Sequence, residues 1–180
     1  MKCHIVIDLE ATCQAEGNSL ESMEIIEIGA VKLNEGFTII DEFDSFVRPE
    51  INPVLTNFCK NLTHISQEDI AEAESFHKVF SFFINWICDP NPVVITWGAY
   101  DIKHLELECK RHGLQLPQYF TENHINLKKV FAKHHKIKRC GMKTALQIAG
   151  IPLEGQLHRG IDDAKNIAKI AQLLLMKKSS

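Results

Sequence analysis

Two acidic residues near the start of the chain are spaced to bind a cation. In this apolar segment Ile5, Ile7 and Leu9 alternate with Asp8 and Glu10. Successive side chains of a strand point to opposite faces, so the two carboxylates share one face, about 7 Å apart at roughly 3.3 Å of rise per residue. Carboxylates at this spacing repel each other, and a cation between them would remove the repulsion. A strand that runs out into solvent at Asp8 is the simpler alternative.

A third carboxylate, Asp163, falls on the inward side of the last predicted helix. The apolar stripe of that helix consists of Ile167, Ile170, Ala171 and Leu174. Steps of three and four residues continue this stripe backwards to Asp163. Burying a lone charge costs several kcal/mol, so we expect a cation or a hydrogen-bond donor beside it. Simple stabilisation of the helix dipole is the alternative, with the neighbouring Asp162 as the cap.

Two further polar residues lie where a sheet would end. Asp101 comes one turn into a predicted helix, just after a buried strand that stops at Gly98. Loops that leave a sheet often carry catalytic groups, although a helix cap explains Asp101 nearly as well. His158 lies in a loop flanked by glycines, five residues before Asp163. It can therefore reach whatever Asp163 contacts, or it is simply an exposed loop residue.

The elements that must position these residues predict an α/β fold. We expect strands over residues 3–9, 25–33 and 37–47, with a turn at 34–36, which suggests an antiparallel meander. A short buried strand is predicted over 93–97, where apolar residues run without alternation. Helices are expected over residues 55–62, 67–88, 100–112, 127–136, 143–150 and 162–176. This order implies a mixed sheet with helices packed on it.

The predicted helix over residues 67–88 has a clear start and a clear inward face. Ser66 is placed to cap it, and Asp69 stands three residues later in a variant of the capping box. One stripe of this helix collects Phe76, Val79, Phe80, Phe83, Ile84 and Ile87. Such a stripe is typical of a helix that faces the core.

Length and composition set the class of protein. The 180 residues suit a single domain, which we expect to span residues 1–180. The chain has 20 basic and 23 acidic residues, a formal net charge of −3, which excludes a surface that is basic throughout. With 45% hydrophobic and 24% charged residues, the composition also excludes intrinsic disorder.

The sequence predicts a cytoplasmic protein with no membrane partner. Nowhere do roughly 18 uncharged apolar residues follow one another, and the apolar run before Asp8 is too short for a signal peptide. The six cysteines form no CxxC pair, so a thiolate zinc site is not expected and reduced thiols fit this compartment.

Taken together, the order of these candidates resembles the DEDDh branch of the DnaQ-like, RNase H-like exonucleases. The resemblance covers nearly the whole chain. Its motifs are similar to those of the Eri-1 group, whose members trim RNA 3′ ends. They are Asp8-Leu-Glu-Ala-Thr-Cys13, Glu24-Ile-Ile-Glu-Ile-Gly-Ala-Val31, Arg48-Pro49 with Asn52-Pro53, Phe58-Cys59 with Leu62-Thr63, and His158-Arg-Gly-Ile-Asp-Asp163 followed by Asn166-Ile-Ala168. The resemblance implies an RNase H-like fold, with a mixed central sheet of about five strands flanked by helices.

The resemblance also implies a catalytic set. Asp8, Glu10, Asp101 and Asp163 would hold two divalent cations, Mg²⁺ or Mn²⁺, with Asp8 bridging the two ions. Hard cations prefer oxygen ligands, and a pair of them can stabilise the attacking and leaving oxygens of an in-line displacement. His158 would take the proton from the attacking water, since an unperturbed imidazole pKa of about 6.5 suits this role near neutrality. The products would be 5′-mononucleotides.

Substrate contacts are expected at three more positions near this set. The resemblance places the terminal sugar beside Ala11 and Thr12, just after the first motif. Tyr100 could stack a base, as aromatic rings do for single strands. Trp97 could do the same, but its place in a buried strand favours packing.

A basic stretch over residues 128–139 is the expected contact for phosphates. It contains Lys128, Lys129, Lys133, Lys136, Lys138 and Arg139, together with His134 and His135. We expect Lys133 and Lys136 to bind the nucleic-acid backbone, with an affinity that falls as salt rises. A solvated helix face is the alternative.

The sequence thus predicts a metal-dependent 3′-to-5′ exonuclease that acts on single-stranded or overhanging RNA, with DNA ends as possible secondary substrates. Two alternatives stay open. One is a DNA-directed exonuclease of the proofreading or repair type, and the other is a non-catalytic module that binds RNA or a protein on the same fold. Release of mononucleotides from labelled ends separates an enzyme from a binding module.

Overall fold

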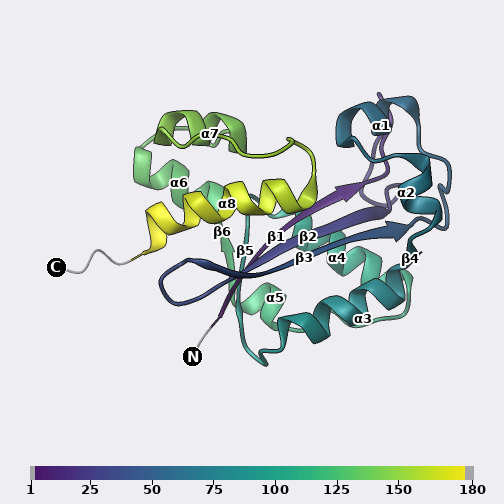
Figure 1. Ribbon diagram of the computed structural model, residues 1–180, viewed down its shortest axis with the longest axis horizontal. Helices are drawn as coiled ribbons and strands as arrows, with labels where there is room; N and C mark the ends of the chain where they lie inside the picture. Colours follow the sequence, from purple (N-terminus) through teal and green to yellow (C-terminus); the bar gives the residue numbers. More distant parts are fainter. Residues whose placement is uncertain (1–2, 177–180) are drawn as a thin grey trace.

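A mixed sheet of six strands forms the centre of the computed structural model, which describes residues 3–176 (Figure 1). The strands are β1 (His4–Ala11), β2 (Ile25–Leu33), β3 (Ile39–Arg48), β4 (Glu74–Ser75), β5 (Val93–Thr96) and β6 (His124–Asn126). Their order across the sheet is β4-β3-β2-β1-β5-β6. The first three strands form the antiparallel meander that was predicted, while β5 runs parallel to β1 and β6 runs parallel to β5.

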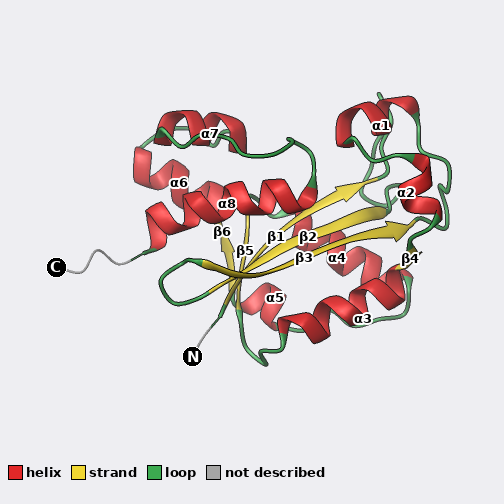
Figure 2. Cartoon of the chain, in the orientation of Figure 1, coloured by secondary structure: helices red, strands yellow, loops and turns green. Residues whose placement is uncertain are grey.

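Helices cover both faces of this sheet (Figure 2). They are α1 (Asn57–Thr63), α2 (Gln67–Ala71), α3 (Phe76–Ile87), α4 (Tyr100–Arg111), α5 (Tyr119–Glu122), α6 (Leu127–His135), α7 (Met142–Ala149) and α8 (Gly160–Leu175). One core joins β1 to α3, α4 and α5, and a second core joins the sheet to α6, α7 and α8. None of the helices in residues 3–176 combines the length and apolar character that a membrane crossing needs.

The alternation predicted for the first strand is confirmed and decides where its carboxylates point. Ile5, Ile7 and Leu9 belong to the core beneath α3 and α4, whereas Val6 belongs to the core beneath α8. Since Asp8 lies on the same strand face as Val6, it points toward the α8 side of the sheet.

The prediction of one long helix over residues 67–88 is wrong. The segment forms α2, then the two-residue strand β4, and then α3. Glu74 and Ser75 pair in parallel with the end of β3, which takes the backbone out of the helical conformation between the two helices. The capping box of Ser66 with Asp69 is confirmed, but it starts a helix of only 5 residues.

Neither β6 nor α5 was expected from the sequence. They have 3 and 4 residues respectively, which is too short for the alternation or the helical period to show. The mixed α/β architecture is as predicted.

The last helix approaches the sheet closely because two glycines face each other. A Cβ atom on Gly29 of β2 would lie only 2.0 Å from the carbonyl carbon of Gly160 at the start of α8. No side chain fits between these backbones, so glycine is required at position 29. Because Gly29 pairs with Asp8 in the β1–β2 register, this contact sets the first turn of α8 beside Asp8.

Candidate active site

The predicted catalytic residues meet in one open cleft of about 410 Å³. All five of these residues line it, namely Asp8, Glu10, Asp101, His158 and Asp163. They come from β1, from the first turn of α4, and from the loop and first turn of α8. The sequence had indicated each of these groups only weakly, and the fold brings them together.

Strand order explains how Asp101 reaches the first motif. Because β5 runs parallel to β1, the two strands end at the same edge of the sheet, and α4 begins just after that edge. The Asp101 carboxylate accepts a hydrogen bond of 3.3 Å from the backbone N–H of Leu9. This bond ties the start of α4 to the strand that carries Asp8 and Glu10.

Hydrogen bonds to the first turn of α8 hold the His158 loop in place. The backbone N–H of His158 donates to Asp163 Oδ2 at 3.0 Å, and that of Gln156 donates to Asp162 at 2.8 Å. His158 has a φ of 62°, in the left-handed region that few side-chain-bearing residues adopt. The surrounding contacts therefore hold a strained backbone at a residue with a predicted chemical role.

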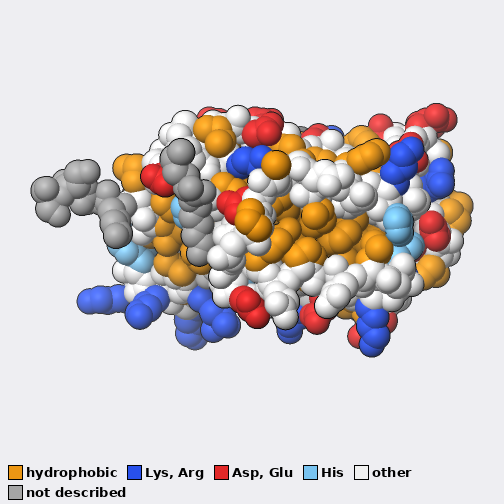
Figure 3. Space-filling view, turned by 90° about the horizontal axis from the view of Figure 1, so that it is seen from below, with side chains coloured by type: hydrophobic (Ala, Val, Ile, Leu, Met, Phe, Trp, Pro, Cys, Tyr) orange, Lys and Arg blue, Asp and Glu red, His pale blue; other side chains and the backbone are white. Residues whose placement is uncertain are grey.

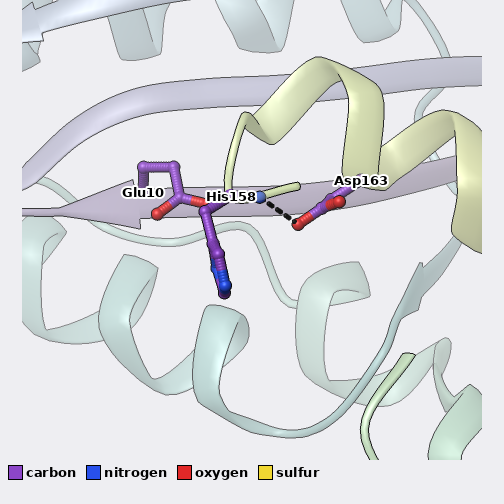
Figure 4. Close-up of side chains that lie close together, drawn as sticks. All are labelled: Glu10, His158 and Asp163. Carbon is purple, nitrogen blue, oxygen red and sulfur yellow. Dashed lines mark hydrogen bonds between the residues drawn. The ribbon is translucent and has the colours of Figure 1, made fainter. Parts of the chain in front are cut away.

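One ligand atom each from Glu10, His158 and Asp163 can be chosen so that all three lie within 4.8 Å of one another. Figure 4 shows the two carboxylates on either side of the His158 backbone, with the imidazole extending from the loop. The dashed line marks the hydrogen bond from the backbone N–H of His158 to Asp163. This spacing is compatible with a shared cation or with a proton transfer beside one.

The carboxylates of the cleft resist ionisation together. Burial and the neighbouring charges of Asp101, Glu10 and Asp163 raise the pKa of Asp8 well above its ordinary value. Burial and Glu27 raise the pKa of Glu10 to about 9. Burial also raises the pKa values of Asp101 and Asp163 to about 6. So many acidic groups without matching positive charge form an electrostatic environment that favours a divalent cation.

A second observation agrees with a cation in the cleft. Asp163 is buried, and its Oδ1 atom has no hydrogen-bond partner among the described residues. A buried carboxylate oxygen without a partner costs free energy unless something else binds it. The acidic set therefore fits hard divalent cations, as predicted.

His158 is suited to accept a proton. Partial burial and the nearby His64 lower its pKa below the ordinary value of 6.5, so the imidazole is neutral at pH 7. Its side chain is exposed to the cleft, where solvent and substrate can reach it.

The predicted aromatic contacts divide in two. Tyr100 lines the cleft with 40% of its surface exposed, so it is available to a base. Trp97 also borders the cleft, but its ring packs against Phe131 and its indole N–H donates to the carbonyl of Cys140 at 3.2 Å. Packing is thus the main role of Trp97, as its buried strand indicated.

Ala11 and Thr12 are not among the residues that line the cleft. Both are buried, and the Thr12 hydroxyl accepts a hydrogen bond of 2.9 Å from the backbone N–H of Glu24. The backbone N–H of Thr12 also donates to the carbonyl of Glu24 at 2.8 Å, so both bonds hold the end of β1 to the start of β2.

Comparison with known proteins decides the family. The profile of the Exonuclease family (RNase_T) matches residues 5–171, which is most of the chain. The chain belongs to the exonuclease family. It is 36% identical over 181 residues to the 3′-5′ exoribonuclease 1 of Rattus norvegicus, a match that covers 94% of this chain and 52% of the relative. It is 35% identical to the human ERI1 exoribonuclease 2, covering 93% of this chain and 27% of that protein. The chain therefore spans about half the length, or less, of these curated relatives.

Solved structures confirm the fold class and the resemblance to DEDDh enzymes. The nuclease domain of 3′hExo, described as a DEDDh family member bound to rAMP, superimposes with a TM-score of 0.89 at 36% identity, covering 97% of this chain and 92% of that chain. Exonuclease I, at 12% identity and a TM-score of 0.78, shares the fold. The predicted RNase H-like architecture is thus confirmed.

Two basic residues of the chain line the cleft, one from the predicted basic stretch and one that the sequence did not indicate. Lys128 and Lys143 border it from α6 and α7, and the charge of Lys128 offsets part of the rise that burial causes in the pKa of Asp101. Lys133 and Lys136, which were singled out, are exposed residues outside the cleft lining. The clustering of lysines in the sequence indicated α6 as the basic element. Only the packing of α6 and α7 shows which of these lysines line the cleft with the carboxylates.

Proposed function

We propose that this chain is a metal-dependent 3′-to-5′ exonuclease that releases 5′-mononucleotides from single-stranded or overhanging RNA, with DNA ends as secondary substrates. The observation that carries the proposal is the convergence of four carboxylates and a histidine from distant parts of the chain in one cleft. The names of its relatives, which are exoribonucleases at 35–36% identity, support RNA as the main substrate.

Asp8, Glu10, Asp101 and Asp163 would hold two divalent cations, Mg²⁺ or Mn²⁺. Such ions, when bound, activate water and balance the charge that develops on a phosphate. The buried Oδ1 atom of Asp163 and the raised pKa values of the acidic set support this assignment.

His158 would accept the proton of the attacking water. Its neutral form at pH 7 and its place beside Glu10 and Asp163 support this role. The hydrogen bond from its backbone to Asp163 would keep the imidazole oriented while the proton moves.

Substrate would be held on both sides of this centre. Tyr100 would stack a terminal base, and Ala11 and Thr12 would contact the terminal sugar. Lys133 and Lys136 would contact phosphates of the strand outside the cleft. Figure 3 shows Lys and Arg side chains gathered at the end of the molecule where Figure 1 places α6, which supports a basic approach path.

A cytoplasmic setting belongs to the same proposal. All six cysteines, which lie within the described residues, are free thiols. Reduced thiols are typical of that compartment.

Digestion of end-labelled RNA and DNA oligomers tests the proposal. The purified protein is incubated with each oligomer in Mg²⁺, in Mn²⁺ or in a chelator. We expect stepwise release of mononucleotides from the 3′ end, dependence on the metal, and a faster rate on RNA than on the matched DNA. Intact ends in every metal would overturn the enzyme assignment, and a faster rate on DNA would overturn the choice of RNA.

A further inference from the structure

An ion pair with a buried carboxylate lies beside Glu10 of the acidic motif. Glu27 on β2 is completely buried, and both of its carboxylate oxygens accept hydrogen bonds from Arg159 Nε at 3.2 and 3.3 Å. Arg159 Nη2 adds a further bond of 3.2 Å. The guanidinium also lies over the ring of Phe46, 5.1 Å from its centroid. Arg159 is therefore fixed by β2 on one side and by β3 on the other.

The same carboxylate completes the start of α8. Arg159 occupies the cap position of this helix, and its side chain makes no cap hydrogen bond. The first backbone N–H groups of a helix need acceptors. Glu27 supplies one from the sheet, because its Oε2 accepts a bond of 3.0 Å from the N–H of Gly160.

The position of this pair connects it to the proposed chemistry. Glu27 pairs with Glu10 in the β1–β2 register, so the pair lies one strand away from the acidic motif. Arg159 directly follows His158, and Gly160 begins the turn that carries Asp163. One carboxylate on β2 thus holds both the end of the His158 loop and the start of α8.

We propose that Glu27 and Arg159 are positioning residues for the exonuclease reaction, so that their ion pair keeps His158 and Asp163 over Asp8 and Glu10. The inference rests on the proposed function for its kinetic readout. A buried ion pair is weak evidence for stability by itself, because desolvation offsets much of its attraction. This ion pair contacts both the end of the His158 loop and the start of α8, which indicates that it sets the geometry of the cleft.

Kinetics of three variants give the first test. We expect Arg159→Ala and Glu27→Gln to lower kcat about 100-fold, the effect of a misplacement of roughly 1 Å, while KM changes little. The double variant should be no slower than Arg159→Ala, because both changes remove the same contact. Lys32→Met is the matched control, since Lys32 is a mostly buried cation of β2, only 16% exposed, whose partners are the carbonyl of Trp86 and the exposed Asp41, neither of which belongs to the His158 loop or to α8. It should keep the wild-type kcat.

Chemical rescue separates positioning from general destabilisation. The Arg159 side chain is 25% exposed, so a small cation can enter the space left by its removal. Added ethylguanidinium should restore kcat at least several-fold in Arg159→Ala, but not in the double variant that lacks the Glu27 charge. Binding of Mn²⁺, measured by calorimetry without substrate, should weaken in Arg159→Ala and recover with ethylguanidinium, because Asp163 moves with α8.

The outcomes distinguish this inference from the proposed function. If the wild-type protein leaves all polynucleotide ends intact, the proposed function fails, and the Mn²⁺ titration alone decides the positioning role. Unchanged Mn²⁺ binding in Arg159→Ala would then overturn it. If the wild-type protein is active, a wild-type kcat in Arg159→Ala, or a loss no greater than in Lys32→Met at equal folded fraction, would overturn it.

Discussion

Asp8 illustrates the conflict that the cleft imposes on single residues. It shares a strand face with Glu10 and stands near Asp101 and Asp163, and all four have raised pKa values. Each carboxylate is therefore unfavourable to its neighbours until positive charge enters. A residue that harms the metal-free fold in this way is explained by a function that needs the charge.

Replacing Asp8 by Asn removes one charge and keeps the shape. We expect Asp8→Asn to weaken Mn²⁺ binding by more than about 10-fold. The same variant should melt at a higher temperature than the wild-type protein in chelator, because one repulsion is gone. Calorimetry and thermal melts measure the two effects, and undiminished Mn²⁺ binding would contradict the ligand role.

Removing the imidazole separates proton transfer from metal binding. We expect His158→Ala to lower kcat by about 10²- to 10⁴-fold, the range of general acid–base catalysis, with little change in Mn²⁺ affinity. Single-turnover rates and calorimetry provide the comparison. Unchanged hydrolysis would remove His158 from the mechanism, and a large loss of Mn²⁺ affinity would make it a ligand instead of a base.

At the level of elements, the contact between β2 and α8 leaves no room for an added side chain. An added methyl group on Gly29 would overlap the backbone of Gly160, so Gly29→Ala must displace α8 or distort β2. We expect a loss of about 1–3 kcal/mol in unfolding free energy, the usual cost of overpacking, with weaker Mn²⁺ binding. In the control Gly98→Ala, the new carbon meets only atoms at 3.9 Å or more, and stability should stay near that of the wild-type protein. Equal denaturation midpoints for both variants would be evidence against the close contact.

Local patterns predicted those elements whose signals are local. The alternation of β1 placed Asp8 and Glu10 on one face, and the apolar stripe of the last helix placed Asp163 inward. The break between α2 and α3 was missed because it depends on pairing of Glu74 with β3, which is distant in sequence.

The same limit applies to the site. Asp101 and His158 came from their places after a strand and before a helix, supported by the family resemblance. Lys143 and the pair of Glu27 with Arg159 could not be found in this way, because only tertiary packing brings Lys143 to the cleft and Arg159 to Glu27. A buried Glu within the apolar pattern of β2 was the one signal available for the pair.

For the whole molecule, the acidic cleft predicts how stability depends on pH. Between pH 7 and 9 an unfolded Glu is already ionised, whereas folded Glu10 keeps its proton up to a pKa of about 9. The folded state then binds more protons than the unfolded state, so unfolding free energy falls as pH rises, by about 1.4 kcal/mol per pH unit for each retained proton. Burial lowers the pKa of His104 to about 4, so this residue titrates below the range from pH 7 to 9. Melting temperatures in chelator should therefore fall from pH 7 to 9 and should fall less in Mn²⁺. A flat profile in chelator would contradict the raised pKa of Glu10.

The distribution of charge predicts how substrate binding depends on salt. Reversal of charge at the exposed Lys133 and Lys136 should raise KM several-fold and leave kcat unchanged. The dependence of log KM on log salt should also become shallower, by about 0.7 for each lost phosphate contact on a single strand. Lys110→Glu serves as the control, since it is an exposed change on α4, which packs on the opposite face of the sheet. An unaltered KM would reduce the basic stretch to a solubility feature.

The cleft draws its acidic groups from both ends of the described chain, with β1 in the middle of the sheet and α8 as the last helix. During translation the ribosome delivers Asp8 early, while Asp163 is still to be made. A nascent chain with the proposed activity is consequently unable to cut RNA until α8 has left the exit tunnel.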